Sequence, residues 1–138
     1  YERIDKWRNR SIDEVFPYVY LDGIVLKRTW AEQFRNVSVF ASIGVPKDGF
    51  RQVLGVVEGA KEDKAGWSNF LLHLKKCGLT GTKLIISDAC LGLKESAVDF
   101  YPNVKWPRCI VHFYRNVFSV VPRRKVKHVA MMLKAIHA

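Results

Sequence analysis

The chain has 138 residues, of which 49% are hydrophobic and 26% are charged, and its net charge is +10. This length suits one domain with a single core, and the composition is that of an ordinary soluble globular protein. No apolar run approaches the roughly 20 residues that a membrane-spanning helix needs, and three cysteines favour a reducing cytoplasm over a secreted disulfide framework.

The positive charge is concentrated near the C-terminus. Asp99 is the last acidic residue, and eight of the 23 Lys and Arg residues follow it, which leaves 15 basic against 13 acidic residues in the first 99. A one-sided basic segment is typical of a protein whose partner carries many phosphates. The alternative is a solvated basic face that only aids solubility, and the charge asymmetry favours nucleic acid over it.

The first strand carries a candidate functional acid. Residues 1–14 are polar and read as an irregular lead-in, whereas residues 15–26 are apolar at odd and even positions, the pattern of a central strand covered on both faces. Asp22 in its middle is costly unless a cation or partner neutralises it. The competing interpretation is a type I′ hairpin turn at Asp22-Gly23, which the local sequence alone favours slightly.

The next segments predict an antiparallel meander followed by helices. A polar connection over 27–36 leads to strands over 37–45 and 50–57, which are joined by a turn of suitable composition. The apolar period then changes to 3.6. Asp63 is expected to cap a core-packing helix that Gly78 ends.

A fourth strand over 83–87 ends at Asp88, where the apolar pattern breaks. Ligand and catalytic groups gather at the carboxyl ends of strands in open α/β sheets, although Asp88 is also a good cap for the next helix. A helical crossover would place this strand parallel to the first and beside it, about 4.8 Å away. Asp22 and Asp88 would then lie side by side, an arrangement that suits Mg²⁺ in phosphoryl transfer.

The C-terminal third is expected to be helical after a short extended piece around 104–106. Residues 110–121 carry a near-ideal buried apolar stripe, with a polar line of Arg108, His112, Arg115 and Ser119 opposite it. Pro122 ends that helix, and a basic helix over 125–137 follows. The predicted fold class is therefore α/β, with a mixed five-stranded sheet (three antiparallel strands, then two parallel) flanked by helices.

Several motifs occur in a fixed order. They are Tyr18-Val19-Tyr20-Leu21-Asp22-Gly23, Ile43-Gly44-Val45, Val53-Leu54-Gly55, Ser87-Asp88 and Arg108-Cys109-Ile110-Val111-His112-Phe113-Tyr114-Arg115-Asn116. This ordered set resembles the Mutator-type transposases, most of all their bacterial insertion-sequence branch, over essentially the whole chain. The resemblance implies an RNase H-like catalytic domain of the DDE class, in which three acids hold two Mg²⁺ or Mn²⁺ ions for DNA strand cleavage and strand transfer.

By matching positions, the resemblance implies that Asp22 is the first acid and Asp88 the second. The third acid of the family is a Glu beyond a helical insertion, and no acidic residue follows Asp99 here. We therefore expect it beyond residue 138, in a longer parent protein, and expect this fragment alone to be inactive or nearly so. Three acids are conceivable substitutes, although none falls where the family places one: Glu58, Glu95 and Asp99.

The resemblance also implies how the chain divides into segments and which residues lie near bound DNA. It implies a lead-in over 1–14, a partial catalytic core over 15–122, and a basic helical segment over 123–138 that begins the insertion. Cys109 and His112 match the family's C-x-x-H signature, which is associated with the active-site region and DNA handling. The expected DNA-binding neighbourhood comprises Arg108, Cys109, His112, Arg115, Arg123, Arg124, Lys125 and Lys127.

The implied partners are transposon ends and target DNA, with a homo-oligomer in the full-length protein and association with the nucleoid in the cytoplasm. A structural zinc site at Cys109 and His112 is a weaker alternative, because such sites usually need four ligands. Two other functions stay open. One is a different RNase H-like nuclease or resolvase, and the other is a non-catalytic DNA-binding remnant of a transposase.

Overall fold

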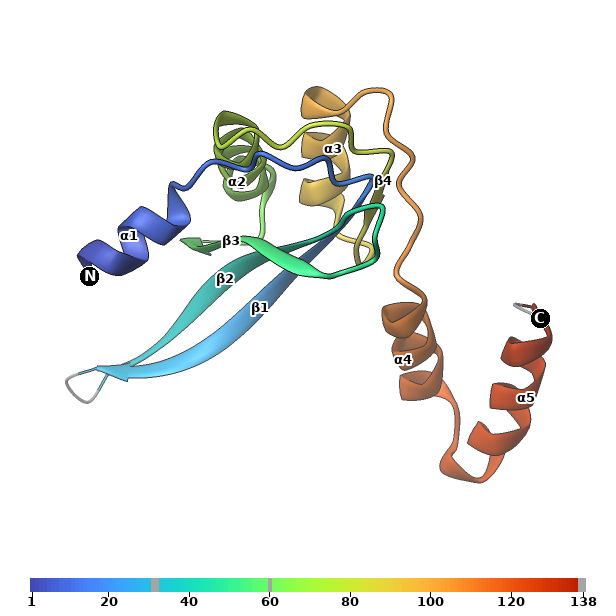
Figure 1. The fold of residues 1–138 in the computed structure, drawn as a ribbon. Coiled ribbons are helices and arrows are strands. Elements are labelled where there is room, and N and C mark those ends of the chain that lie inside the picture. The colour runs from blue at the N-terminus through green and yellow to red at the C-terminus, as the bar shows by residue number, and fades with distance from the viewer. Residues whose placement is uncertain (31–32, 60, 137–138) are drawn as a thin grey trace. The chain divides into compact units, whose positions relative to one another are not determined.

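The structure is a computed structural model that describes residues 1–138 except 31–32, 60 and 137–138, and the side chains of residues 28, 30 and 33–35 are also not described. The chain forms two compact units, residues 1–107 and residues 108–138, whose elements are labelled in Figure 1. No described helix is both long and apolar enough to cross a membrane.

A mixed sheet of four strands, in the order β3-β2-β1-β4, forms the first unit. The strands are β1 (Tyr18–Trp30), β2 (Gln33–Val45), β3 (Gln52–Gly59) and β4 (Leu84–Ile86). The first three are antiparallel neighbours, and β4 runs parallel to β1. This confirms the predicted α/β class with a meander followed by a parallel strand.

The predicted fifth strand around 104–106 is reduced to a single residue among those described. Lys105 forms one parallel bridge with Leu84, and its backbone exchanges hydrogen bonds of 3.0 and 3.1 Å with Ile85 and Lys83. Pro102 and Pro107 bracket this segment. Because proline has no backbone N–H to donate, a longer ladder cannot form there.

The predicted polar connection over 27–36 is wrong. β1 continues to Trp30 and β2 begins at Gln33, and the ladder runs without interruption to the Trp30–Gln33 pair. Residues 31–32 of the expected connection lie outside the described residues. The turn at Asp22-Gly23 is excluded as well, because Asp22 pairs with Ala41 in the middle of the ladder.

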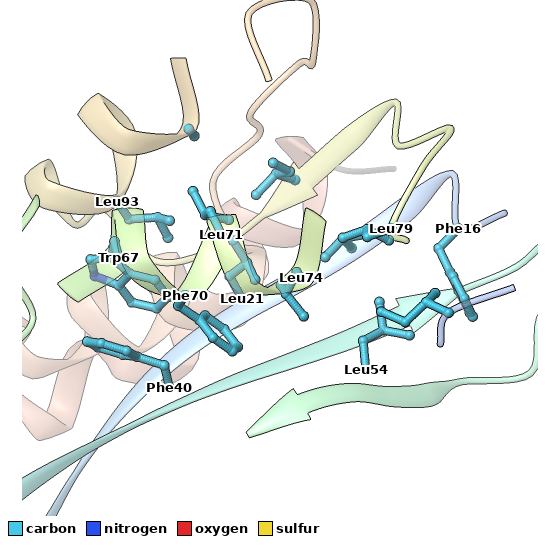
Figure 2. Close-up of a cluster of buried hydrophobic side chains, with 14 residues drawn as sticks. Phe16, Leu21, Phe40, Leu54, Trp67, Phe70, Leu71, Leu74, Leu79 and Leu93 are labelled. Atoms are coloured by element: carbon cyan, nitrogen blue, oxygen red, sulfur yellow. The ribbon is translucent and has the colours of Figure 1, made fainter. Parts of the chain in front are cut away.

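One face of the sheet carries the core. Helices α2 (Lys64–Lys76) and α3 (Leu91–Phe100) pack against each other, and their buried residues share one core cluster with buried residues of all four strands. Figure 2 shows the cluster, in which the rings of Phe40 and Trp67 stack with their centroids 4.3 Å apart. Asp63 caps α2 as predicted, since its carboxylate accepts a hydrogen bond of 2.9 Å from the Gly66 N–H.

The opposite face of the sheet is open in the described chain. Tyr18 and Tyr20 of β1 remain 43% and 37% exposed, and Ile43 of β2 is 36% exposed. The expectation that the first strand is covered on both faces is therefore wrong for this structure. The apolar residues at even positions of β1 form an uncovered surface instead of a second core.

The N-terminal arm contains a helix, α1 (Glu2–Arg8), where an irregular lead-in is predicted. An exposed ion pair between Glu2 and Lys6, 2.9 Å long and one helical turn apart, supports it. After α1, Ile12 is buried and its N–H donates to the Cys77 carbonyl at 2.7 Å, which fixes the arm to the end of α2.

The second unit consists of α4 (Ile110–Val120), a short 3₁₀ helix at Arg123–Lys125, and α5 (Val126–Ile136). The bend between the helices falls at Pro122, as predicted. The Tyr114 hydroxyl donates to the Leu133 carbonyl at 3.2 Å and joins the two helices. The apolar stripe of α4 is only partly covered, and no α4 residue is buried, so the predicted buried stripe is wrong.

Candidate active site

The two predicted acids follow paired residues of neighbouring parallel strands. Tyr18 pairs with Leu84 and Tyr20 with Ile86. Asp22 lies two residues beyond Tyr20 within β1, and Asp88 lies two residues beyond Ile86, where β4 ends. Side chains alternate between faces along a strand. Asp22 therefore lies on the open face with Tyr18 and Tyr20, where it is exposed, and Asp88, just after the end of β4, is half-buried.

Hydrogen bonds hold the backbone and carboxylate of Asp88 and the side chain of the neighbouring Ser87. Its Oδ1 accepts a 2.7 Å bond from the Ala89 N–H. The neighbouring Ser87 hydroxyl donates to the Asp88 carbonyl at 2.9 Å and accepts a 2.8 Å bond from the Trp106 indole N–H. Asp88 is not the cap of α3, because Cys90 occupies that position and makes no capping side-chain bond. The helix-cap alternative is therefore wrong.

A third acid, Glu62, approaches this end of the sheet from the loop before α2. A Cβ atom added to Gly23 would lie 2.7 Å from Glu62 Cδ and 2.8 Å from its Oε1. The Cys90 thiol also donates to the Glu62 carbonyl at 3.8 Å. Because side chains alternate along a strand, Glu62 lies on the face of β1 opposite to the one that carries Asp22. The sequence analysis did not predict this position of Glu62. The feature of the sequence that relates to it is Gly23, which has no side chain where the Glu62 carboxylate lies.

The acids that sequence reasoning considered as substitutes lie elsewhere. Glu58 is exposed near the end of β3, and Glu95 is exposed on α3. Asp99 forms an exposed ion pair of 3.1 Å with Lys64. Within the described residues, no group of three or more His, Cys, Asp or Glu side chains is arranged to hold a metal ion.

The donor chemistry at Asp22 and Asp88 fits a hard divalent cation in part. Mg²⁺ prefers oxygen ligands, and it commonly takes only one or two protein carboxylates while water and substrate phosphate fill the other positions. Both acids can reach water, since neither is buried. The pair is therefore suitable as part of a magnesium site that other oxygen ligands complete.

The other predicted site residues lie in the second unit. Cys109 is the N-cap residue of α4, and its carbonyl accepts a 3.0 Å bond from the Phe113 N–H. Cys109 and His112 are both half-buried, and Cys109 is a free thiol. The Arg108 guanidinium lies 5.6 Å from the centre of the Phe113 ring. Residues 108–138 contain seven Lys and Arg and no acid, and four of them are exposed around the 3₁₀ helix: Arg123, Arg124, Lys125 and Lys127.

A mixed sheet with one acid on a strand and a second acid just after the end of the neighbouring parallel strand is an arrangement suited to metal-dependent chemistry on phosphates. The sequence identifies the family directly. The family described as "Transposase, Mutator family" matches residues 1–138, and the chain belongs to it.

Curated relatives are transposases of bacterial insertion sequences. The transposase of IS256 from Staphylococcus aureus is 35% identical over 134 residues, which are 96% of this chain and 34% of that protein. The transposase of ISRM5 from Rhizobium meliloti is 35% identical over 89% of this chain and 31% of its own length. That of IS1081 from Mycobacterium tuberculosis is 33% identical over 99% and 33%. The chain spans about a third of the curated relatives that it matches.

Two solved structures show weaker likeness. An intasome of simian T-cell lymphotropic virus superposes with a TM-score of 0.43 at 11% identity, covering 89% of this chain and 54% of that chain. The HTLV-2 integrase catalytic core domain in complex with magnesium gives a TM-score of 0.38 at 16% identity, covering 78% and 68%. Superpositions of this quality transfer neither activity nor metal content to this chain.

Proposed function

We propose that this chain is part of an RNase H-like catalytic domain of a DDE-class transposase, which cleaves DNA strands and joins them to target DNA with divalent metal ions. The observation that carries the proposal is that β1 and β4 are parallel neighbours, with Asp22 two residues after Tyr20 and Asp88 two residues after its partner Ile86. Membership of the transposase family supports DNA as the substrate.

Asp22 and Asp88 would hold Mg²⁺ or Mn²⁺, with two ions in the complete site. A bound ion supplies Lewis-acid stabilisation of the charge that develops on a phosphate during strand cleavage. The residues around Asp88 orient its carboxylate. The Ala89 N–H holds one oxygen of Asp88, and the Ser87 hydroxyl holds its carbonyl, so the carboxylate is positioned before any ligand arrives.

The third acid of the complete site would be a Glu outside these 138 residues, and this segment alone would then cleave poorly. The basic residues of the second unit would bind phosphates of transposon ends and target DNA, since Lys and Arg contacts give sequence-independent affinity that falls with salt. Assembly of the full-length protein into a homo-oligomer, and a cytoplasmic, nucleoid-associated location, belong to the same proposal.

The experiment compares full-length wild-type protein with Asp22→Asn and Asp88→Asn in Mg²⁺-dependent nicking of a labelled duplex. Partners that only orient metal ligands cost 10–100-fold when removed, so we expect a loss of at least about 100-fold for the ligands themselves. Asp99→Asn is the matched control, because Asp99 is an exposed acid that pairs with Lys64 away from this site. Normal cleavage by either site variant would show that the assignment is wrong.

The second candidate is a nuclease or resolvase whose site is complete within this chain. It would need a third acid beside Asp22 and Asp88, and among the described residues no group of three such side chains is arranged to hold a metal ion. In that case the 138-residue chain would nick DNA with Mg²⁺ by itself. If neither this segment nor the full-length protein cleaves, the chain is a DNA-binding remnant.

A further inference from the structure

The junction between the end of α1 and the end of α2 brings three atoms together that can bind a metal ion. They are Nε2 of His73, Sγ of Cys77 and the backbone carbonyl oxygen of Arg8. Nε2 lies 3.0 Å from the carbonyl oxygen and 3.7 Å from Sγ, and Sγ lies 3.8 Å from the carbonyl oxygen. All three residues belong to the first unit, so their arrangement is defined within one compact body.

These distances fit three corners of a tetrahedral zinc site. Zinc binds sulfur at about 2.3 Å, histidine nitrogen at about 2.0–2.1 Å and oxygen at about 2.0–2.2 Å. In a regular tetrahedron these bond lengths place nitrogen and oxygen roughly 3.4 Å apart, and each of them roughly 3.6 Å from sulfur. The three observed distances differ from these values by about 0.4 Å or less. A zinc ion can therefore enter with small side-chain movements.

The positions of the two side chains on α2 also favour a cation. His73 and Cys77 are four residues apart, so they lie on the same face of the helix, and this is a spacing that paired zinc ligands use on helices. His73 belongs to the last turn of α2, and Cys77 is its C-cap residue. The helix dipole places partial negative charge at this end, which stabilises a positive ion.

Solvent can supply the fourth ligand. Zinc sites that keep an open position have three protein ligands and a water molecule. His73 and Cys77 are both half-buried, and His73 also lines a cavity of about 420 Å³ between β3 and α2. The arrangement uses two side chains and one carbonyl oxygen. It is therefore compatible with the finding that no group of three metal-binding side chains occurs among the described residues.

We propose that His73, Cys77 and the Arg8 carbonyl bind a zinc ion, which ties the N-terminal arm to the end of α2. Without metal, Nε2 donates to the Arg8 carbonyl, because a carbonyl oxygen can only accept. Zinc binding moves the imidazole proton to Nδ1 and releases the thiol proton to solvent, so that Nε2 and the thiolate each offer a lone pair. This inference does not depend on the proposed function.

The first test adds Co²⁺, a spectroscopic substitute for zinc, to the full-length protein after treatment with a chelator. A thiolate ligand gives Co²⁺ an intense charge-transfer absorption, which Zn²⁺ should abolish by displacing Co²⁺. Cys77→Ser should lose this band, and His73→Gln should weaken Co²⁺ binding by at least about 10-fold. Cys90→Ser and Cys109→Ser are the matched controls and should keep the band, because Cys90 and Cys109 are also free, half-buried thiols.

The second test follows the peptide bond whose carbonyl oxygen would be a ligand. Trypsin cleaves after arginine, and cleavage between Arg8 and Asn9 requires the arm to detach from α2. At a free Zn²⁺ concentration 100 times the dissociation constant, the detached population falls about 100-fold. Cleavage at this bond, measured by mass spectrometry, should slow by up to that factor in wild type. Zn²⁺ should not slow it in Cys77→Ser, which also controls for any effect of Zn²⁺ on trypsin.

Three results would overturn the proposal. Loss of the Co²⁺ band in Cys109→Ser but not in Cys77→Ser would place the metal at Cys109 and His112. Absence of the band from wild type would show that hydrogen bonds alone hold the three atoms together. Equal rates of cleavage after Arg8 with and without Zn²⁺ would show that the carbonyl is not a ligand. Circular dichroism melts confirm that each variant is folded, and His73→Gln serves as the second variant if Cys77→Ser does not fold.

Discussion

The indole N–H of Trp106 donates a 2.8 Å hydrogen bond to the hydroxyl of Ser87, which is 2% exposed and directly precedes Asp88. The same hydroxyl donates to the Asp88 carbonyl at 2.9 Å. The segment that was expected to form a fifth strand therefore positions the end of β4 through one side chain. Partners of this kind tune metal ligands without touching the metal.

Trp106→Phe should raise the Mg²⁺ concentration that cleavage requires, with only a small loss of folding stability. Phenylalanine keeps most of the apolar contact but removes the donor, at a stability cost of about 1 kcal/mol. We expect a 10–100-fold increase in the Mg²⁺ concentration that gives half-maximal nicking by the full-length protein. Ser87→Ala should give a similar shift, and the double variant should be little worse than either single variant, because both remove the same link.

The control for that experiment is Trp7→Phe, since Trp7 lies on the N-terminal arm and is 38% exposed. It should leave the Mg²⁺ requirement unchanged. A Trp106→Phe protein with a lower melting temperature but a normal Mg²⁺ requirement would mean that Trp106 serves packing alone.

Substitution of alanine for each of two glycines of the sheet should change the free energy of unfolding by different amounts. At Gly59 an added Cβ would lie 2.4 Å from Cε2 of the Phe40 ring, which is buried and cannot withdraw. Overpacking of this kind costs about 1–3 kcal/mol. At Gly23 the clash is with the carboxylate end of Glu62, whose side chain is flexible. Gly23→Ala should therefore change the free energy of unfolding by less than about 1 kcal/mol, also because alanine restricts the unfolded chain.

Urea denaturation of the two variants and of wild type measures this difference. A Gly23→Ala protein as destabilised as Gly59→Ala would show that Glu62 is held rigidly against the strand.

Local signals predicted the elements whose structure depends on their own residues. Helix α2 follows from a 3.6-residue apolar period, from Asp63 as its cap, and from Gly78, whose φ of +105° suits glycine at a helix end. The parallel placement of β4 beside β1 followed from the crossover rule, and the structure confirms it. These inferences need no knowledge of distant contacts.

The features that the sequence did not reveal depend on contacts between distant segments. The extension of β1 and β2 through the polar residues 27–30 and 33–36 comes from cross-strand pairing, which leaves no periodic trace in a mixed polar stretch. The place of Glu62 depends on how the loop before α2 packs on Gly23. The sequence predicted that both faces of β1 are covered, whereas one face is exposed. Apolar residues at alternate positions do not show whether another element covers them.

Removal of the Asp63 cap should destabilise the first unit by about 1 kcal/mol. Its carboxylate accepts from the Gly66 N–H at 2.9 Å, and loss of such a cap costs about 0.5–2 kcal/mol. Asp63→Asn keeps an acceptor oxygen and should retain most of the stability, whereas Asp63→Ala should not. Thermal melts of the three proteins measure the effect, and equal melting temperatures for the Ala and Asn variants would contradict it.

Tyr101 should make the fold sensitive to high pH. Burial raises the pKa of its hydroxyl from 10.0 to about 12, and its buried oxygen has no hydrogen-bond partner in the described part of the chain. The folded state therefore favours the neutral phenol. The stability that this provides is complete below pH 10 and is lost as the pH rises towards 12, because the unfolded chain ionises first. The free energy of unfolding should fall over this range.

Other groups titrate between pH 10 and 12, so the informative quantity is the difference between wild type and Tyr101→Phe at each pH. Phenylalanine cannot ionise and leaves no buried hydroxyl without a partner, so the variant should match or exceed wild type in stability at pH 8. Its advantage should grow from pH 10 to 12. Tyr18→Phe is the control, since Tyr18 is 43% exposed and should show no such growth. A constant difference for Tyr101→Phe across this range would mean that the Tyr101 hydroxyl reaches water in the folded protein.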